Sequence, residues 1–384
     1  MLMQLVVENF LSFQGAAVLS LVAVEGMEHG EQHCVRVPGL PPILKCAAVY
    51  GANASGKSNL LRAVDFVRNL VVRGTKGDDG IGVKPFKLDT GSADRPSRFE
   101  LDLCCGGVHY AYGFVADKKQ ILEEWLLDHQ DGEERLLFRR VRSEDHPDRP
   151  TIELGDALST TPSRRQFLSF VAEGTRPNQL FLTEAYERNT TELKPLLAWF
   201  RSLYVFFPGA RINQLAHIAH REPELRDFIA DYLARAGTGV SEVSVHRAEA
   251  VEFPDDADDA FQFRTHHRST DGSRVTFELE EESDGTQRLM HLAPFIYRLD
   301  RLGADTQRIY AVDELERSLH PLLTRSFVET FLASGSLGAP GQLLFTTHDT
   351  NLLDLTLLSR DSIWFTEKDP SGASTLYSLA EFKG

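Results

Sequence analysis

The sequence has few cysteines, and their arrangement gives no sign of a disulfide framework. Four occur in 384 residues, and none forms a C-x-x-C pair. They are Cys34, Cys46, Cys104 and Cys105. Adjacent Cys104 and Cys105 would face opposite sides of a strand, so they are poor partners for each other. We therefore expect reduced thiols and a cytoplasmic protein.

The sequence also lacks an excess of basic charge and a long hydrophobic run. Its 41 Lys and Arg stand against 56 Asp and Glu, a net charge of −15, so nucleic-acid binding would need a local patch or a partner. The longest apolar run, Ala16–Val24, is far shorter than the roughly 20 residues of a membrane span. The N-terminus has no basic region of a signal peptide. We expect no membrane partner, and a globular chain with a sizeable core.

The pattern along the chain predicts an α/β fold. Strands are expected at Met3–Phe10, Ala16–Val24 and Cys46–Tyr50, a helix at Ser58–Val72, and an antiparallel meander over Arg98–Val141. Helical spacing dominates between Arg164 and Ala236, and strands and helices alternate afterwards. We predict an N-terminal lobe at 1–160, a helical insertion at 161–238 and a C-terminal lobe at 239–384.

The strongest motif is G-A-N-A-S-G-K-S at Gly51–Ser58, which fits G-x-x-x-x-G-K-[ST] without a mismatch. The two glycines let backbone N–H groups converge on phosphate oxygens. Lys57 would reach the β- and γ-phosphates, and the Ser58 hydroxyl would ligate Mg²⁺. A chance glycine-rich turn is the alternative, but an apolar strand precedes the motif and an amphipathic helix follows it. The predicted nucleotide-binding residues here are Gly51, Asn53, Ser55, Gly56, Lys57, Ser58 and Asn59.

A second motif, R-I-Y-A-V-D-E at Arg308–Glu314, is an apolar strand that ends in two acids. Asp313 suits the Mg²⁺ shell, and Glu314 suits a general base that aligns water against a γ-phosphate. An ordinary strand end with solvated acids is the alternative. The phosphate loop favours the functional interpretation.

Two weaker motifs follow. In E-S-D-G-T-Q-R-L, Ser283 and Gly285 stand where a helix begins and would form an anion site. A plain N-cap explains them equally well in isolation. In L-L-F-T-T-H-D, His348 at a strand end is placed to touch a γ-phosphate or the attacking water, although such a histidine is usually structural.

The order of these four motifs resembles the ABC-type ATPase heads of RecF and SMC proteins. More narrowly, the chain resembles stand-alone RloA-like and AbiL-like AAA family ATPases of prokaryotic defence systems. The blocks that carry this likeness beyond the motifs are Asn9–Phe13, Asp313–Pro321, Ile363–Asp369 and Leu376–Leu379. The resemblance implies a P-loop ABC-type fold with a mixed central sheet, an antiparallel β subdomain and a helical insertion.

The resemblance also implies ATP and Mg²⁺ as cofactors, with Lys57, Glu314 and His348 as catalytic residues and Ser58 and Asp313 as metal ligands. Two copies would hold ATP between them in a homodimer or higher homo-oligomer. Ser283 of one copy would cap the γ-phosphate held by Lys57 of the other. Ser318 and His320 would lie where the family's D-loop crosses the dimer axis, or would simply cap a helix.

The function implied is that of an ATPase that senses infection or regulates a separate effector, a nuclease or toxin, in anti-phage defence. The chain departs from the family pattern at the Q-loop, because Val83–Leu88 occupies its expected region without a glutamine. No long heptad pattern lies between Ser58 and Ser283, so an SMC-like coiled-coil arm is not expected.

A RecF-like DNA-repair clamp is the main alternative, and it would need a continuous basic face. Candidate clusters are Arg139, Arg140 and Arg142, then Arg164 and Arg165, then His266, His267 and Arg268. Most charge clusters are solvated faces, so direct DNA binding is possible but not favoured. The nucleotide-binding subunit of a transporter is disfavoured by the large insertion, the missing Q-loop glutamine and the missing membrane segment.

Overall fold

The computed structural model describes residues 1–27, 30, 32–130, 132–142, 150–209, 212–247, 261–301, 307–334 and 341–382. The strands in these ranges form sheets of seven, six, three and two strands. Helices cover the sheets, so the predicted α/β class is confirmed.

A six-stranded sheet carries the predicted phosphate loop. Its strands are, in spatial order, β11 (Leu203–Phe206), β15 (Arg308–Val312), β16 (Gly341–Thr346), β5 (Cys46–Tyr50), β17 (Ile363–Lys368) and β18 (Ser374–Ser378). All neighbours are parallel except the β17–β18 pair. β5 and β16 are buried along their whole length, as parallel strands covered on both faces should be. The residues that follow β5, β15 and β16 therefore meet at one edge of the sheet.

The expected antiparallel meander is confirmed as part of the seven-stranded sheet. Its strands are, in spatial order, β10 (Thr151–Leu154), β9 (Glu133–Val141), β8 (Ile121–Gln130), β7 (Val108–Ala116), β6 (Ser97–Cys105), β1 (Leu2–Glu8) and β2 (Ala17–Ser20). Phe99, Leu101 and Leu103 are all buried, which is the period of two that the sequence predicts. A short pair, β3 (Cys34–Val35) and β4 (Ile43–Leu44), completes the N-terminal region.

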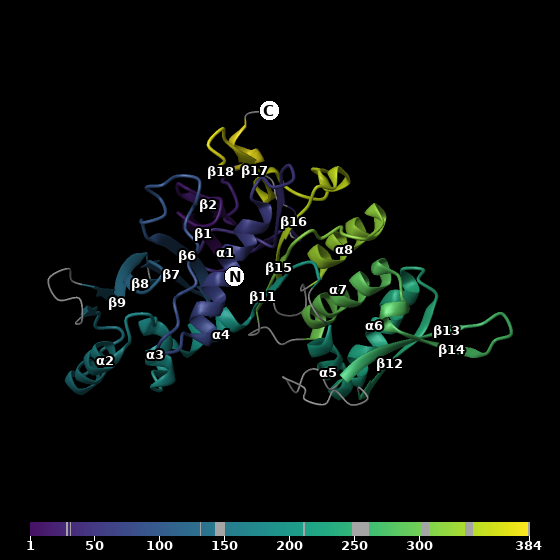
Figure 1. Cartoon of the computed structure of the whole chain (residues 1–384), viewed down its shortest axis with the longest axis horizontal. Helices are drawn as coiled ribbons and strands as arrows, with labels where there is room; N and C mark the ends of the chain where they lie inside the picture. The colour runs from purple at the N-terminus through teal and green to yellow at the C-terminus, as the bar shows by residue number, and fades with distance from the viewer. Residues whose placement is uncertain are drawn as a thin grey trace.

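Helix α1 (Lys57–Arg73) follows the phosphate loop and packs its apolar face into the core. Its buried residues include the predicted positions Leu60, Leu61, Val64, Val67 and Val71. The Phe66 ring lies 5.0 Å from the ring of Phe99, centroid to centroid, in the seven-stranded sheet. Figure 1 shows α1 with β1 and β6 on one side and β15 and β16 on the other. The helix is thereby fixed between the two large sheets.

Residues 161–238 are mainly helical, but one strand lies among the helices. The helices are α2 (Pro162–Gly174), α3 (Phe181–Glu187), α4 (Lys194–Arg201), α5 (Asn213–Arg221) and α6 (Pro223–Arg235). Between α4 and α5, β11 pairs in parallel with β15 of the six-stranded sheet. The segment is therefore not purely a helical insertion. Four apolar residues show no period that separates strand from helix, so the pairing with β15 decides the outcome.

The C-terminal part adds a three-stranded sheet and two helices. The strands are β12 (Val240–Arg247), β13 (Phe261–Arg268) and β14 (Arg274–Glu278), and the helices are α7 (Asp284–Arg301) and α8 (Pro321–Ala333). Figure 1 shows this sheet beside α5, α6 and α7, at the far side from β8 and β9. The sequence predicts strands at Val240–Val245 and Arg274–Glu280, which correspond to β12 and β14, whereas β13 was not expected. No helix in the described ranges has the length and apolar character needed to cross a membrane.

Glu124 on β8 is a fully buried carboxylate that holds the start of α3. It accepts the backbone N–H groups of Phe181 at 2.5 Å and Leu182 at 3.0 Å, and the Tyr112 hydroxyl at 3.1 Å. Burial raises the pKa of Glu124, and the hydrogen bonds only partly offset this. The contact ties the meander to the helical segment.

Replacing Glu124 with Ala is expected to lower the free energy of unfolding by about 3 kcal/mol, because two buried N–H groups lose their acceptor. Urea unfolding followed by circular dichroism would measure the loss. Glu123→Ala is the matched control: Glu123 pairs with the exposed Arg139 at 2.8 Å, and losing such a pair costs less than about 1 kcal/mol. Equal losses in the two variants would contradict this role of Glu124.

Candidate functional site

The phosphate loop follows β5 and enters α1, and its two glycines are required by close packing. A Cβ on Gly51 would lie 2.4 Å from the carbonyl oxygen of Thr366. A Cβ on Gly56 would lie 2.3 Å from the Ser374 hydroxyl, and Gly56 has a φ of +119°. Any side chain at either position would displace the loop.

The β17–β18 hairpin packs against this loop through hydrogen bonds. The Ser55 hydroxyl lies 2.6 Å from the Thr366 hydroxyl, and the Ser374 hydroxyl donates to the Ser55 carbonyl oxygen at 2.6 Å. The Ser374 and Ser12 hydroxyl oxygens lie 2.8 Å apart. Residues more than 300 positions apart in the sequence thus set the shape of the loop.

Lys57 lies folded against the loop that it follows. Its ammonium donates to the carbonyl oxygens of Gly51 at 2.7 Å and Ala52 at 3.1 Å. Burial lowers the pKa of Lys57, and the nearby carboxylates of Asp313, Glu316 and Glu314 oppose this. The Lys57 side chain is thus a partly desolvated cation that lies against the loop and lines the pocket.

Ser58 and Asp313 lie in direct contact, as the magnesium prediction requires. The Ser58 hydroxyl donates to Asp313 Oδ1 at 3.0 Å, and the Thr346 hydroxyl donates to the same oxygen at 2.6 Å. Asp313 is 4% exposed. A serine hydroxyl and a buried carboxylate at a phosphate site are a donor set that fits Mg²⁺, which takes few protein ligands and completes its shell with phosphate oxygens and water.

Glu314 is held in an unusual backbone conformation. Its φ is +49°, and its N–H donates to the Thr346 hydroxyl at 2.9 Å. The Arg288 guanidinium, on α7, donates to the carbonyl oxygens of Asp313 at 3.1 Å and Glu314 at 2.8 Å. A non-glycine residue in the left-handed region persists only where its surroundings fix it. The Glu314 side chain lines the pocket and pairs with Arg317 at 3.1 Å.

His348 follows β16 and is oriented by Glu316. Its Nε2 lies 3.2 Å from Glu316 Oε1, which also accepts the His348 backbone N–H at 2.9 Å. The Glu316 side chain is 12% exposed, whereas the His348 ring is 53% exposed. The ring is therefore anchored on one side and open to the pocket on the other.

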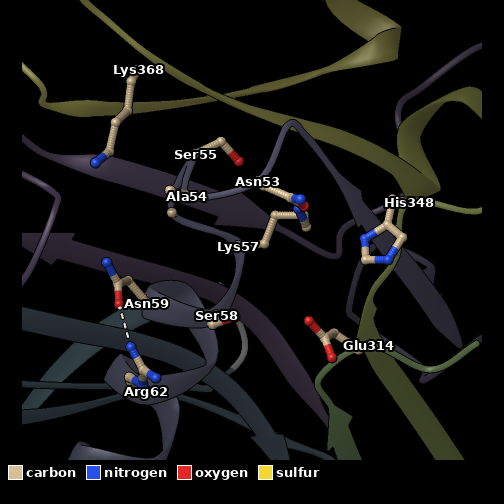
Figure 2. A pocket seen from close by; sticks show the side chains of 11 residues that line it. Asn53, Ala54, Ser55, Lys57, Ser58, Asn59, Arg62, Glu314, His348 and Lys368 are labelled. Atoms are coloured by element: carbon tan, nitrogen blue, oxygen red, sulfur yellow. Dashed lines mark hydrogen bonds between the residues drawn. The ribbon is translucent and has the colours of Figure 1, made fainter. Parts of the chain in front are cut away.

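These residues surround one pocket of about 580 Å³ above the loop (Figure 2). The residues that line it are Asn53, Ala54, Ser55, Gly56, Lys57, Ser58, Asn59, Arg62, Glu314, His348 and Lys368. The structure thus brings together the predicted loop residues other than Gly51, with Glu314 and His348. Sequence reasoning missed Arg62 and Lys368. It also missed Thr346 and Arg288, which do not line the pocket but form hydrogen bonds with Asp313 and Glu314. Val83–Leu88 does not belong to the described lining; its Lys84 carbonyl instead accepts the Leu11 N–H at 2.8 Å.

Ser283 and Gly285 lie outside this lining, at the start of α7. The Ser283 hydroxyl accepts the Thr286 N–H at 3.2 Å, which is an N-cap contact. A Cβ on Gly285 would lie 2.9 Å from the Ser318 carbonyl oxygen, and Ser318 has a φ of +61°. His320 caps α8, since its Nδ1 accepts the Leu322 N–H at 3.3 Å. The capping roles are thus present, and the start of α7 packs directly on the turn after Glu314.

The basic clusters are largely engaged within the chain. Arg139 pairs with Glu123, Arg164 with Glu192 and Arg165 with Asp156. Arg140 is buried, and His267 Nε2 lies 2.7 Å from a Glu282 carboxylate oxygen. Arg139, Arg140, Arg164, Arg165 and His267 are thus engaged by other groups of the chain.

The strand, phosphate loop and helix, with acids and a histidine at the same sheet edge, define the site of a P-loop ATPase. The chain belongs to the family described as "AAA domain, putative AbiEii toxin, Type IV TA system", whose model matches residues 46–354. No curated protein matches the sequence.

Two SMC head structures are similar to the chain over almost its full length. One is the SMC head bound to the C-winged helix domain of ScpA, with 13% identity, a TM-score of 0.45 and coverage of 98% of this chain and 97% of that one. The other is the SMC head domain from Thermotoga maritima, with 13% identity, a TM-score of 0.42 and coverage of 98% of both chains.

Proposed function

We propose that the chain hydrolyses ATP as a homodimer closed around the nucleotide, and regulates a separate effector in prokaryotic anti-phage defence. The observation that carries the ATPase part is the pocket formed by the phosphate loop, Glu314 and His348, with the buried Asp313 in contact with Ser58 of that loop. ADP and phosphate would be the products.

Each pocket residue has a role in this reaction. The Lys57 ammonium would exchange its loop carbonyls for β- and γ-phosphate oxygens. The Glu314 carboxylate would align a water against the γ-phosphate and accept its proton. His348, oriented by Glu316, would donate a hydrogen bond to a γ-phosphate oxygen. When bound, Mg²⁺ would neutralise phosphate charge from its place on Ser58 and Asp313.

We infer the dimer because two phosphate-binding features of one chain lie apart. Ser283 and Gly285, at the N-terminus of α7, do not line the pocket that contains Lys57, Glu314 and His348. A helix N-terminus attracts phosphate. A second copy would bring its own α7 against the γ-phosphate, so that ATP joins the two copies and hydrolysis releases them.

Replacing Ser283 with Arg tests this arrangement. We expect the substitution to remove the Ser283 contact with the γ-phosphate held by the second copy and thereby to abolish ATP turnover, while ATP still binds the phosphate loop of the same chain with unchanged affinity. Phosphate release and calorimetric titration would measure the two quantities. Ser269→Arg, at the turn between β13 and β14, is the control. Full turnover by the Ser283 variant would contradict the shared site.

The defence role rests on the family, whose description names an AbiEii toxin and a type IV toxin–antitoxin system. The effector would be a nuclease or toxin encoded by a neighbouring gene. Phage plating on cells that carry both genes would test this role. Protection that depends on Glu314 and on the neighbouring gene is expected, and protection by the neighbour alone would contradict a regulatory function.

A further inference from the structure

Two basic side chains line the pocket on the side away from Glu314 and His348. Figure 2 shows Lys368 at the upper left and Arg62 at the lower left, and Glu314 and His348 at the right, with residues of the phosphate loop between the two pairs. Lys368 lies beyond residues 46–354, the part of the chain that the family model covers. Neither residue has a place in the reaction described above.

The position of Lys368 follows from the pairing of β17. This strand runs parallel to β5, with Phe365 opposite Tyr50, and the Thr366 side chain contacts Ser55 of the loop. Alternate residues of a strand share a face, so Lys368 projects from the same face as Thr366, one step further along. The ammonium is thereby directed past the loop to the pocket.

Arg62 reaches the pocket from the second turn of α1. Its guanidinium donates to Asn59 Oδ1 at 3.0 Å, and the Asn59 amide in turn donates to the Ser12 hydroxyl at 2.8 Å. These hydrogen bonds orient the Arg62 guanidinium but do not neutralise its charge.

Both charges lack an acidic partner in the described ranges. The Lys368 ammonium makes no hydrogen bond or ion pair there, and Arg62 contacts only the neutral Asn59. The first turn of α1 contains no acid either. In a chain of net charge −15, two uncompensated cations beside a phosphate loop form a local site of positive potential.

We infer that Lys368 and Arg62 bind the α-phosphate end of the nucleotide, an inference that rests on the proposed function. The γ-phosphate end is set by Ser58, Asp313 and Glu314. A triphosphate that runs along the loop from that end has its α-phosphate beside the two cations. Lys368 thus determines how tightly the site holds di- and triphosphates, and the hydrolytic residues are separate from it.

Calorimetric titration of Lys368→Ala with ADP tests this assignment, and ATP is titrated in a Glu314→Gln background to prevent turnover. We expect affinity to fall about five- to tenfold for both nucleotides, because both carry the α-phosphate. The loss should shrink at high salt, where exposed charges are screened. Lys368→Arg should restore binding, and Arg62→Ala should show a similar loss.

The control is Lys119→Ala, an exposed lysine on the turn between β7 and β8, which should bind both nucleotides as the unaltered chain does. A loss for ATP alone would assign Lys368 to the γ-phosphate and overturn the inference. Unchanged affinity for both nucleotides, or an equal loss in the Lys119 control, would also overturn it. If the unaltered chain bound neither nucleotide, the proposed function itself would fail.

Discussion

Replacing Glu314 with Gln is expected to reduce ATP turnover by about 100-fold or more, because the amide cannot accept the proton of the attacking water. The backbone contacts that fix this position involve the Thr346 hydroxyl and the Arg288 guanidinium, and they do not depend on the carboxylate. The variant should therefore fold and bind ATP normally. Because the bond between the β- and γ-phosphates of ATP is not broken, the two copies should stay together. The variant should therefore accumulate as a dimer in the presence of ATP.

Steady-state phosphate release and light scattering with ATP would measure these two effects. The control is Glu280→Gln, which changes an exposed carboxylate near the end of β14 and should hydrolyse ATP normally. Unchanged turnover in the Glu314 variant would remove Glu314 from the reaction. Lost ATP binding would mean that its side chain serves the pocket's structure instead.

Replacing Lys57 with Ala is expected to abolish measurable nucleotide binding at micromolar concentrations. The partly buried Lys57 ammonium is the cation that would pair with the nucleotide phosphates. Removing one partner of a desolvated ion pair costs about 2–5 kcal/mol of binding free energy. Fluorescence titration with a labelled ATP would measure the affinity.

The free chain should tolerate this change, because its ammonium contacts only loop carbonyls of Gly51 and Ala52. Thermal unfolding in the absence of nucleotide should therefore be close to that of the unaltered chain. ATP should raise the unfolding temperature of the unaltered chain but not of the variant. An equal rise in both would contradict the role of Lys57.

The parts of the fold that sequence could predict are those with local signals. β5 and α1 were expected with nearly the observed bounds, since an apolar run, a glycine-rich turn and helical spacing lie within 30 residues. In the meander, β6 shows the expected alternation at Phe99, Leu101 and Leu103. The loop residues, Glu314 and His348 were likewise found by motif, and the structure brings them to one pocket.

The parts that could not be predicted depend on distant contacts. β11 is four residues long, and only its pairing with β15 makes it a strand. Thr366 and Ser374, which contact Ser55 of the loop, lie more than 300 positions after it in the sequence. Lys368 and Arg288 carry no motif of their own, and each reaches the site because its element packs there. Local patterns therefore predicted several residues that meet at the pocket, and tertiary packing determined which other side chains surround it.

The central claim is that each ATP is held by Lys57 of one copy and Ser283 of another. Mixing the Lys57→Ala and Ser283→Arg variants tests it most directly. Each variant alone should be inactive, but a mixed dimer contains one site built from an intact loop and an intact α7 start. ATP turnover should therefore reappear on mixing. If the mixture stays inactive, or if the Ser283 variant is active alone, the nucleotide is not shared between the two copies.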